Sequence, residues 1–171
     1  RAMAATYYAR PLTSHTADMT YPLVQMLQAD LTFDRWCEFV AECCSPTSEI
    51  VPGEGCEDIL WLRSRGIIVV ANERGYIHGL FSYQVHDDMA DGRVLHLDNV
   101  MTVEIVSRPY VLDAMREAMT RLAAEHQCGN VYVSLGEMDQ RQRDYFKAAG
   151  FTPRKVRYCA PATPFKPAIS A

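Results

Sequence analysis

The spacing of apolar residues changes several times along the chain, and each change marks the boundary of an expected element. A short strand is expected at residues 7–12, followed by a first helix for which Thr20 offers an N-cap, with Pro22 close behind it. A second helix is expected to begin near Thr32. One of its faces is apolar at helical spacing: Phe33, Trp36, Cys37, Val40 and Cys44.

The middle of the chain has the pattern of three consecutive antiparallel strands. Residues 67–71 are β-branched and almost entirely apolar, which is typical of a buried strand. Turn residues at 72–75 and 87–92 separate this segment from two further extended runs, at 76–85 and 93–103. We therefore expect a three-stranded meander.

Helical spacing returns in the last third of the chain. A long helix is expected over residues 109–127, followed by a strand at 130–135, a shorter helix at 140–149 closed by Gly150, and a last strand at 155–159. Because a helix connects the third meander strand to the strand at 130–135, those two strands should be parallel neighbours.

Together these elements predict a mixed α/β (α+β) fold in a single domain spanning residues 1–171. We expect one mixed, mostly antiparallel sheet of about six to seven strands, with about four helices on both of its faces. The core should occupy about residues 7–159, and the proline-rich residues 160–171 should form a tail. A segment rich in Pro, Gly and Glu, residues 45–57, reads as a loop.

Charge and cysteine content narrow the classes of function. The chain carries 17 basic and 21 acidic residues, a formal net charge of −4, and no basic stripe, which argues against nucleic acid as the main partner. No apolar run approaches the roughly 18–20 residues needed to cross a membrane, so no membrane partner is expected. The six cysteines form no C-x-x-C pair, so we expect free thiols, no metal site and a reducing, cytoplasmic location.

Two polar residues in the third meander strand are candidates for acid–base chemistry. His96 and Asp98 are two residues apart and should share one face of the strand, and strict alternation puts Val94, Val100 and Thr102 on that face as well. Such a pair could act as a general base near an amine, or it could be a structural hydrogen bond. The nearby carboxylate of Glu104, just past the strand, is an alternative base.

The order of elements and two local motifs resemble the GNAT superfamily of acyl-CoA-dependent N-acyltransferases. Tyr145–Phe151 (YFKAAGF) is similar to the family's aromatic-x-x-x-Gly-Phe signature, and Val100–Met115 (VMTVEIVSRPYVLDAM) lies at the family's strand–loop–helix junction. The resemblance covers residues 7–159. It implies acetyl-CoA, or another acyl-CoA, as co-substrate and a small-molecule or protein amine as acceptor.

The resemblance also implies positions for the bound donor. The pantetheine arm would pair with the main chain of Val100, Met101 and Thr102, where the family's fourth strand separates from its fifth strand. The pyrophosphate would lie on the following loop and helix start, with contacts from four residues: Arg108, Tyr110, Val111 and Leu112. Tyr110 and Leu112 replace both glycines of the family pattern, so either the Arg108 side chain compensates or the loop binds no CoA.

The family's general acid is a tyrosine whose position is occupied here by Phe146, which cannot donate a proton. Tyr145 is adjacent and becomes the candidate acid, although one residue of helix rotates it by about 100°. The departures from the family pattern keep a second hypothesis open, a catalytically inactive GNAT-fold binding or scaffold module. A third is a noncatalytic homodimer that shares a sheet edge through the proline-rich tail.

Overall fold

The computed structural model of the chain describes residues 6–44, 56–103, 109–136, 139–155, 157 and 159. Within this part of the chain, five strands form one sheet in the order of the sequence. The strands are β1 (Tyr7–Pro11), β2 (Arg65–Asn72), β3 (Ile77–Asp88), β4 (Gly92–Thr102) and β5 (Asn130–Val133). The first four pair antiparallel, whereas β4 and β5 are parallel.

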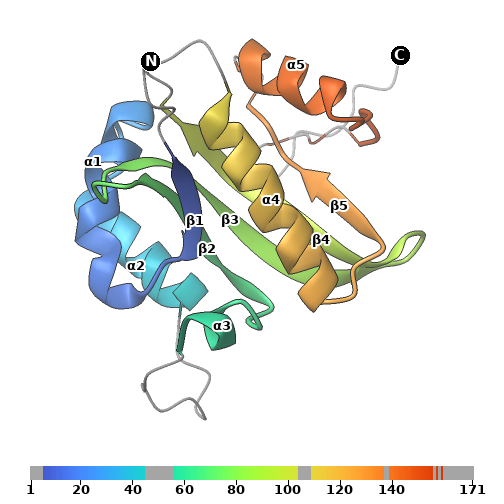
Figure 1. Cartoon of the computed structure of the whole chain (residues 1–171), viewed down its shortest axis with the longest axis horizontal. Helices are drawn as coiled ribbons and strands as arrows, with labels where there is room; N and C mark the ends of the chain where they lie inside the picture. The colour runs from blue at the N-terminus through green and yellow to red at the C-terminus, as the bar shows by residue number, and fades with distance from the viewer. Residues whose placement is uncertain are drawn as a thin grey trace, which may run out of the picture.

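Helices cover both faces of this sheet. The described residues contain five α-helices and a short 3-10 turn at Ser14–Thr16. The helices are α1 (Ala17–Leu27), α2 (Phe33–Cys44), α3 (Cys56–Leu60), α4 (Tyr110–Glu125) and α5 (Gln140–Ala148). Figure 1 shows α4 lying across the front of the sheet and α5 close to β5, with α1 and α2 grouped together away from them.

The period of two along the strands sorts their side chains into two cores. One core joins α4 and α5 to one face of the sheet, for example through Ile68, Phe81 and Leu97. The other joins α1 and α2 to the opposite face through the alternate positions, such as Ile67 and Leu80. These side chains are at most 1% exposed, so the central strands are buried on both faces, as their continuous apolar sequence predicts.

A single glycine lets α4 approach the sheet closely. A Cβ atom built on Gly79 of β3 would lie 2.6 Å from Cε of Met115 and 2.8 Å from Cγ1 of Val111, both on α4. Real Cβ atoms essentially never make contacts this short, so a larger residue at position 79 would force Val111 and Met115 of α4 to shift. Gly79 therefore fixes the position of the N-terminal half of α4 relative to the end of β4.

Strand β4 contains a bulge at Asn99. Leu80 of β3 lies opposite Met101, but Ser82 lies opposite Asp98, so β4 has one residue more than β3 over this stretch. Asn99 has a φ of 53°, in the left-handed region that asparagine tolerates better than most residues. Its Nδ2 donates to Oγ of Ser82 at 2.9 Å, which holds the bulge in place.

The bulge reverses the faces of β4. Leu97, before the bulge, and Val100, after it, both pack against the core on the α4 side, whereas Met101 packs against the core on the α1 and α2 side. The expectation that Val100 shares a face with His96 and Asp98 is therefore wrong, because the extra residue shifts the alternation by one position. The meander itself is confirmed, with its two turns where expected.

Two other predicted boundaries need correction. The first helix begins at Ala17, so Thr20 is not its N-cap. Thr20 lies buried inside the helix, where its Oγ1 donates to the Ala17 carbonyl at 2.6 Å and accepts from Nε1 of Trp36 at 3.0 Å. The region expected to be a loop contains α3 at its end, from Cys56, and its residues 45–55 lie outside the described part of the chain.

The expected count of six to seven strands is also wrong for the described residues, which form five. In the segment predicted as a last strand, the described residues Lys155, Arg157 and Cys159 belong to no strand. Lys155 and Arg157 instead direct their charged ends at the carboxylates of Asp88 and Asp98.

Candidate functional site

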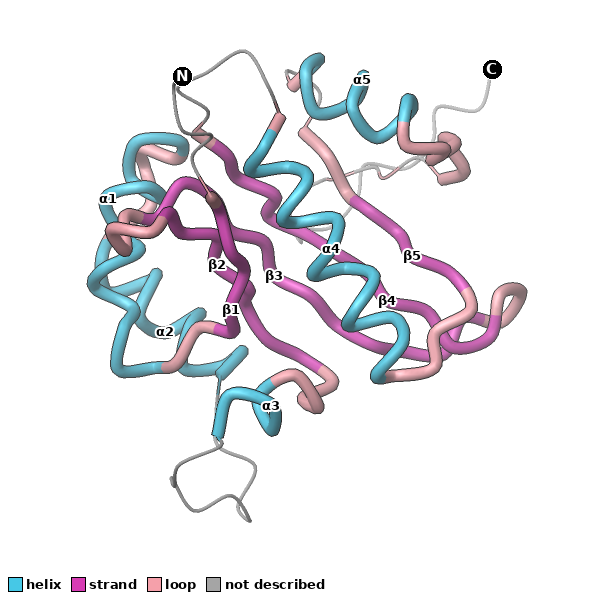
Figure 2. The backbone as a smooth tube through the Cα atoms, viewed as in Figure 1, coloured by secondary structure: helices cyan, strands magenta, loops and turns pink. Residues whose placement is uncertain are grey.

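The two parallel strands β4 and β5 separate about halfway along β4. Their ladder runs from Val94 opposite Asn130 to Leu97 opposite Val133, and its last hydrogen bond is from Ser134 N–H to the Leu97 carbonyl at 2.9 Å. Strand β4 continues to Thr102 without β5 beside it. Figure 2 shows the two strands running together at one end and diverging toward the other.

The main chain of β4 beyond this point presents polar groups to the gap. Val103 N–H donates to the His78 carbonyl of β3 at 2.7 Å, so the groups of Val103, and by alternation those of Met101, point toward β3. The groups of Val100 and Thr102 then point the other way, into the gap. Of the three β4 residues expected to contact a donor, the structure thus turns the main chain of two toward the gap and that of Met101 away from it.

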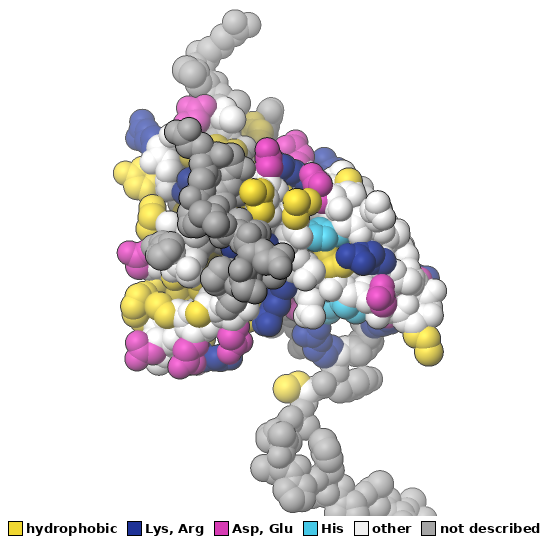
Figure 3. Space-filling view, turned by 90° about the horizontal axis from the view of Figure 1, so that it is seen from below, with side chains coloured by type: hydrophobic (Ala, Val, Ile, Leu, Met, Phe, Trp, Pro, Cys, Tyr) yellow, Lys and Arg dark blue, Asp and Glu magenta, His cyan; other side chains and the backbone are white. Residues whose placement is uncertain are grey.

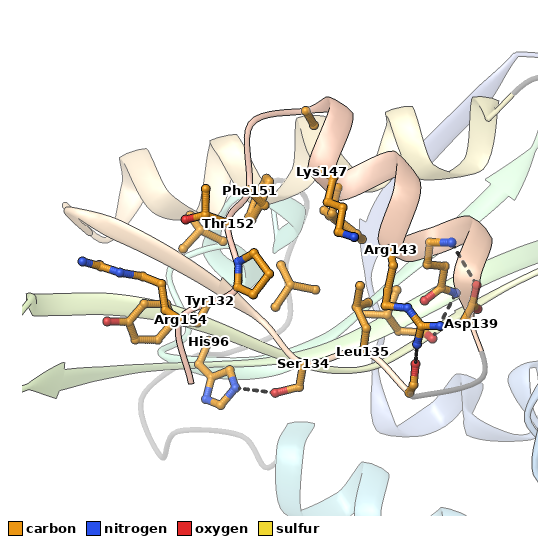
Figure 4. A pocket seen from close by; sticks show the side chains of 18 of the residues that line it. His96, Tyr132, Ser134, Leu135, Asp139, Arg143, Lys147, Phe151, Thr152 and Arg154 are labelled. Atoms are coloured by element: carbon orange, nitrogen blue, oxygen red, sulfur yellow. Dashed lines mark hydrogen bonds between the residues drawn. The ribbon is translucent and has the colours of Figure 1, made fainter. Parts of the chain in front are cut away.

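The gap opens into a cleft with a volume of about 2030 Å³. Its walls are the end of β4, the outer edge of β5 with the segment that follows it, and α5. Figure 4 shows the side chains of Arg143 and Lys147 extending from α5 toward Leu135 on the opposite wall. The cleft is therefore lined by main-chain polar groups on one wall and by basic side chains on another.

A cluster of polar side chains lies where the two strands separate. Nε2 of His96 is 2.8 Å from Oγ of Ser134, and the two groups are hydrogen-bonded (Figure 4). The same Nε2 is 3.7 Å from Oδ2 of Asp98. Since Leu97 packs on the α4 side, His96 and Asp98 point to the opposite face of the sheet. The pair expected from the sequence is therefore formed, with Ser134 as a third member.

The environment of His96 favours its neutral form. Burial lowers the pKa of His96 from its ordinary value of 6.5, and the positive charge of Arg157 acts in the same direction. The negative charge of Asp98 opposes these effects but does not outweigh burial. A neutral imidazole has a nitrogen lone pair that can accept a proton, so His96 is in the state that a general base requires near neutral pH.

A basic residue from the C-terminal segment completes this cluster. Nη1 of Arg157 lies 3.3 Å from Oδ1 of Asp98, and its Nη2 lies 3.4 Å from Oγ of Ser134. The face of the molecule in Figure 3 shows histidine side chains lying among Lys and Arg side chains. Arg157 is highly exposed, with 68% of its side chain accessible, so it marks the solvent side of the cluster.

The buried side-chain amide of Gln142 extends from helix α5 into the gap. Gln142 is 3% exposed, and its Nε2 lies 3.4 Å from the Val100 carbonyl and 3.3 Å from Oγ1 of Thr102. Its position is fixed at the helix start, where the Asp139 carboxylate accepts from the Gln142 N–H at 2.9 Å. A primary amide therefore already lies against the β4 main chain that faces the gap.

The expected pyrophosphate-binding residues are only partly described. Arg108, together with the alternative base Glu104, lies outside the described residues. Tyr110 begins α4, and its ring stacks on Tyr7 of β1 with centroids 6.4 Å apart. The next two residues, Val111 and Leu112, have side chains buried in the core on the α4 side. Only their main chain is placed to face a ligand at the start of this helix.

The candidate acid Tyr145 lies away from the cleft. Its hydroxyl donates to Oδ1 of Asp113 on α4 at 2.6 Å, and it is not among the residues that line the cleft. Phe146, at the position of the family's tyrosine, lines the cleft and is 3% exposed. The structure therefore brings His96 and Asp98 together near the gap but does not bring Tyr145 to them.

Sequence reasoning missed Ser134, Gln142, Asn99 and Arg157. Only Asn99 carried a signal that could have been used, because an asparagine within a strand is unfavourable unless the backbone turns there. Ser134 needs the register of β4 with β5, and Gln142 needs the rotation of α5. Neither quantity can be obtained from residue spacing.

The described residues contain neither a cluster of metal ligands nor a membrane-spanning helix. No three His, Cys, Asp or Glu side chains gather there as metal ligands. The rings of His86 and His96 have centroids 5.9 Å apart, and Asp98 is the partner of His96 already described. Of the helices described, none has the length and apolar character needed to span a membrane.

Comparison with known proteins gives matches of structure only. No protein-family model and no curated protein sequence matches the chain. An aminoglycoside N-acetyltransferase solved in complex with CoA matches with a TM-score of 0.70 at 12% identity, covering 95% of this chain and 99% of that one. Glucosamine-6-phosphate N-acetyltransferase from Arabidopsis thaliana matches with a TM-score of 0.62 at 13% identity, covering 92% and 99%.

A third solved structure extends the range of acceptors. The ribosomal-protein-alanine N-acetyltransferase from Brucella melitensis biovar Abortus 2308 matches with a TM-score of 0.65 at 12% identity, covering 92% of this chain and 99% of that one. These three enzymes share a fold and differ in the molecule that their names say they act on. With the mixed sheet, the parted β4 and β5 strands and the helices on both faces, the chain has the fold of the GNAT superfamily of N-acetyltransferases.

Proposed function

We propose that the protein is an acyl-CoA-dependent N-acyltransferase, which transfers an acetyl or related acyl group from CoA to an amine. The observation that carries this proposal is the end of the β4–β5 ladder at Leu97 and Val133. Beyond it, the polar groups of Val100 and Thr102 face a cleft in which an amide-bearing ligand can pair with them.

The contact made by Gln142 supports the same proposal. Its amide nitrogen lies 3.4 Å from the Val100 carbonyl, a longer separation than an ideal hydrogen bond. The carbonyl therefore accepts from an amide in this direction but does so weakly. The two secondary amides of a pantetheine arm are the same kind of donor, and they can approach more closely because they are not tethered to α5.

In the proposed reaction, His96 deprotonates the acceptor amine and Asp98 assists it. An amine attacks a thioester only after its ammonium form has lost a proton, and neutral His96 accepts that proton. The Asp98 carboxylate, 3.7 Å from Nε2 of His96, then stabilises the imidazolium. His96 and Asp98 lie on the face of the sheet opposite α4 and α5, so the acceptor would approach from there while the donor occupies the gap.

The basic side chains of the cleft suit a phosphorylated donor. Arg143 and Lys147 are one helical turn apart on α5 and line the cleft. Nη1 of Arg143 donates to the Gly136 carbonyl at 2.9 Å, which holds the guanidinium at the cleft wall. Tyr110 and Leu112 stand in place of glycines at the start of α4. Arg143 and Lys147 are therefore an additional source of positive charge for the phosphates of CoA.

Calorimetry with acetyl-CoA, free CoA and a longer acyl-CoA tests donor binding. We expect heat of binding with at least acetyl-CoA, and the absence of heat with all three would reject the proposal. Turnover is then measured as thiol release with three acceptors: an aminoglycoside, glucosamine 6-phosphate and a peptide with N-terminal alanine.

A catalytically inactive GNAT-fold binding module is the second candidate. It is favoured by one observation, the hydrogen bond that ties the Tyr145 hydroxyl to Asp113 and leaves the buried Phe146 beside the cleft. Such a module would bind acetyl-CoA in the calorimeter but release no thiol with any acceptor. An active transferase has to protonate its leaving group by another residue.

A further inference from the structure

We infer that Ser134 is the residue that protonates the departing CoA thiolate, and that it is resupplied with a proton by His96. This inference rests on the proposed acyltransferase function. It assigns the general acid, a role for which the positions expected from the sequence offer no donor facing the cleft.

Ser134 lies at the end of the β4–β5 ladder, directly after β5. Its main-chain N–H makes the last bond of the β4–β5 ladder, to the Leu97 carbonyl at 2.9 Å. The side chain of Ser134 therefore lies where the gap begins, and it lines the cleft. A thioester whose pantetheine arm pairs with Val100 and Thr102 reaches this point at its sulfur end when the arm enters from the open end of the gap.

The side chain of Ser134 is hydrogen-bonded to His96. Oγ of Ser134 and Nε2 of His96 are 2.8 Å apart, within the range for direct proton transfer between the two atoms. His96 lies in β4, and Ser134 is the first residue after β5. The register of the parallel pair, together with the bond from Ser134 N–H to the Leu97 carbonyl, sets this distance.

Electrostatics at Ser134 favour release of its proton. Nη2 of Arg157 lies 3.4 Å from Oγ, and a nearby guanidinium stabilises negative charge that develops on the hydroxyl oxygen. Asp98, which also lies near His96, is paired with Nη1 of the same arginine. Arg157 thus screens Ser134 from the carboxylate that would otherwise hinder loss of a proton.

The other hydroxyl groups near the cleft are less well placed. The Tyr145 hydroxyl donates to Asp113 on α4, and the hydroxyl of Tyr132 donates to Asp91. Oγ1 of Thr102 lies against Nε2 of Gln142, inside the gap and away from His96. Of the hydroxyl groups in the described residues that line the cleft, that of Ser134 is the one bonded to a titratable imidazole.

The proposed step balances in protons and bonds. The acceptor's ammonium gives one proton to the His96 imidazole, and the resulting amine forms a C–N bond with the thioester carbonyl carbon. When the tetrahedral intermediate collapses, the C–S bond breaks and its electron pair goes to sulfur. The thiolate takes the Ser134 Oγ proton, and Ser134 regains a proton from Nε2 of His96. One proton has then moved from the ammonium to the thiol, and both residues are back in their initial state.

The test compares three variants: Ser134→Ala, Ser134→Thr and Tyr132→Phe. Tyr132→Phe is the matched control, because it removes a hydroxyl from the same face of β5 two residues earlier. Each protein is titrated with acetyl-CoA by calorimetry and assayed for thiol release with the acceptor that the unmodified protein turns over fastest.

We expect Ser134→Ala to lower kcat by about 100-fold, the usual scale for loss of a general acid, with the Kd for acetyl-CoA almost unchanged. Ser134→Thr retains a hydroxyl and should recover most of the activity, and Tyr132→Phe should keep it. Normal kcat in Ser134→Ala, or loss of acetyl-CoA binding in that variant, would overturn the inference. Failure of the proposed function is distinguishable, since the unmodified protein would then bind no acetyl-CoA or release no thiol.

Discussion

At the scale of single residues, the chemistry of the site depends on how His96 is buried. The His96 side chain is 24% exposed. The nearby Asp98 carboxylate raises its pKa, whereas the Arg157 guanidinium lowers it. Burial is the larger effect and keeps the imidazole neutral. The same residue on an exposed strand face would be partly protonated near neutral pH and less effective as a base.

Replacing His96 by Gln should lower kcat by about 100-fold or more, because the amide cannot accept the ammonium proton. In the unmodified protein, the acidic limb of kcat/KM should lie below pH 6.5, since the pKa of His96 is lowered from that value. His86→Gln is the control, because the His86 ring is 5.9 Å from His96 and should influence the limb only slightly. An unchanged pH profile in His96→Gln would exclude His96 as the base.

The same pKa shift has a consequence for stability. The folded protein holds the pKa of His96 below 6.5, so the unfolded chain binds that proton more tightly. Stability should therefore fall as the pH drops through 6.5 toward the lowered pKa, and His96→Gln should remove this part of the pH dependence. Urea unfolding at several pH values measures both, and an equal loss of stability in the two proteins between pH 7 and pH 5 would contradict it.

At the scale of secondary-structure elements, two structural features determine the position of the candidate site. The bulge at Asn99 reverses the faces of β4, so that His96 and Val100 serve opposite sides of the sheet. The approach of α4 to β3 at Gly79 sets where the helix start lies relative to the end of β4. Gly79 lies opposite Thr102, so both features are close to the part of β4 that has no β5 beside it.

Gly79→Ala should destabilise the fold by about 1–3 kcal/mol, the usual cost of overpacking a core. The added methyl group would lie 2.8 Å from Cγ1 of Val111, a stiff β-branched side chain that has little room to move. Gly129→Ala is the matched control, because its Cβ would find no atom closer than 3.9 Å. Equal unfolding free energies for the two variants in urea would show that α4 does not depend on Gly79.

Much of this element structure could be predicted from the sequence, and the reasons for success and failure are physical. The buried strand β2 and the long helix α4 have strong periodic patterns, so their existence followed from apolar spacing. The start of α1 did not, because Thr20 is buried under Trp36 rather than capping the helix. The face of Val100 could not be predicted either, since one left-handed residue shifts the pattern.

The candidate site was predictable only where it is local in sequence. His96 and Asp98 are two residues apart on one strand, so their proximity followed from alternation. Ser134 lies 38 residues from His96 and meets it only through the parallel register of β4 and β5. For the same reason, nothing in the residue spacing indicated that Tyr145 would turn toward Asp113.

At the scale of the whole molecule, the central claim is that an opened parallel sheet receives a thioester donor. The three solved structures named above share the fold over nearly the whole chain at 12–13% identity, so few of their side chains are the same as those of this chain. Main-chain contacts do not depend on side-chain identity, because every residue other than proline carries the same N–H and C=O groups. The β4 main chain can therefore bind such a donor although Tyr110 and Leu112 stand in place of glycines.

Amide hydrogen exchange in the presence of saturating acetyl-CoA tests this claim most directly. The amide protons of Val100 and Thr102 point into the gap, and we expect acetyl-CoA to slow their exchange by about fivefold, the effect of one hydrogen bond of about 1 kcal/mol. The amide of Arg74, in the exposed turn between β2 and β3, serves as the internal reference, because it exchanges without global unfolding. Slowed exchange at Val100 and Thr102 with Arg74 unchanged is the predicted result. Binding of acetyl-CoA with no change at either β4 amide would contradict the account.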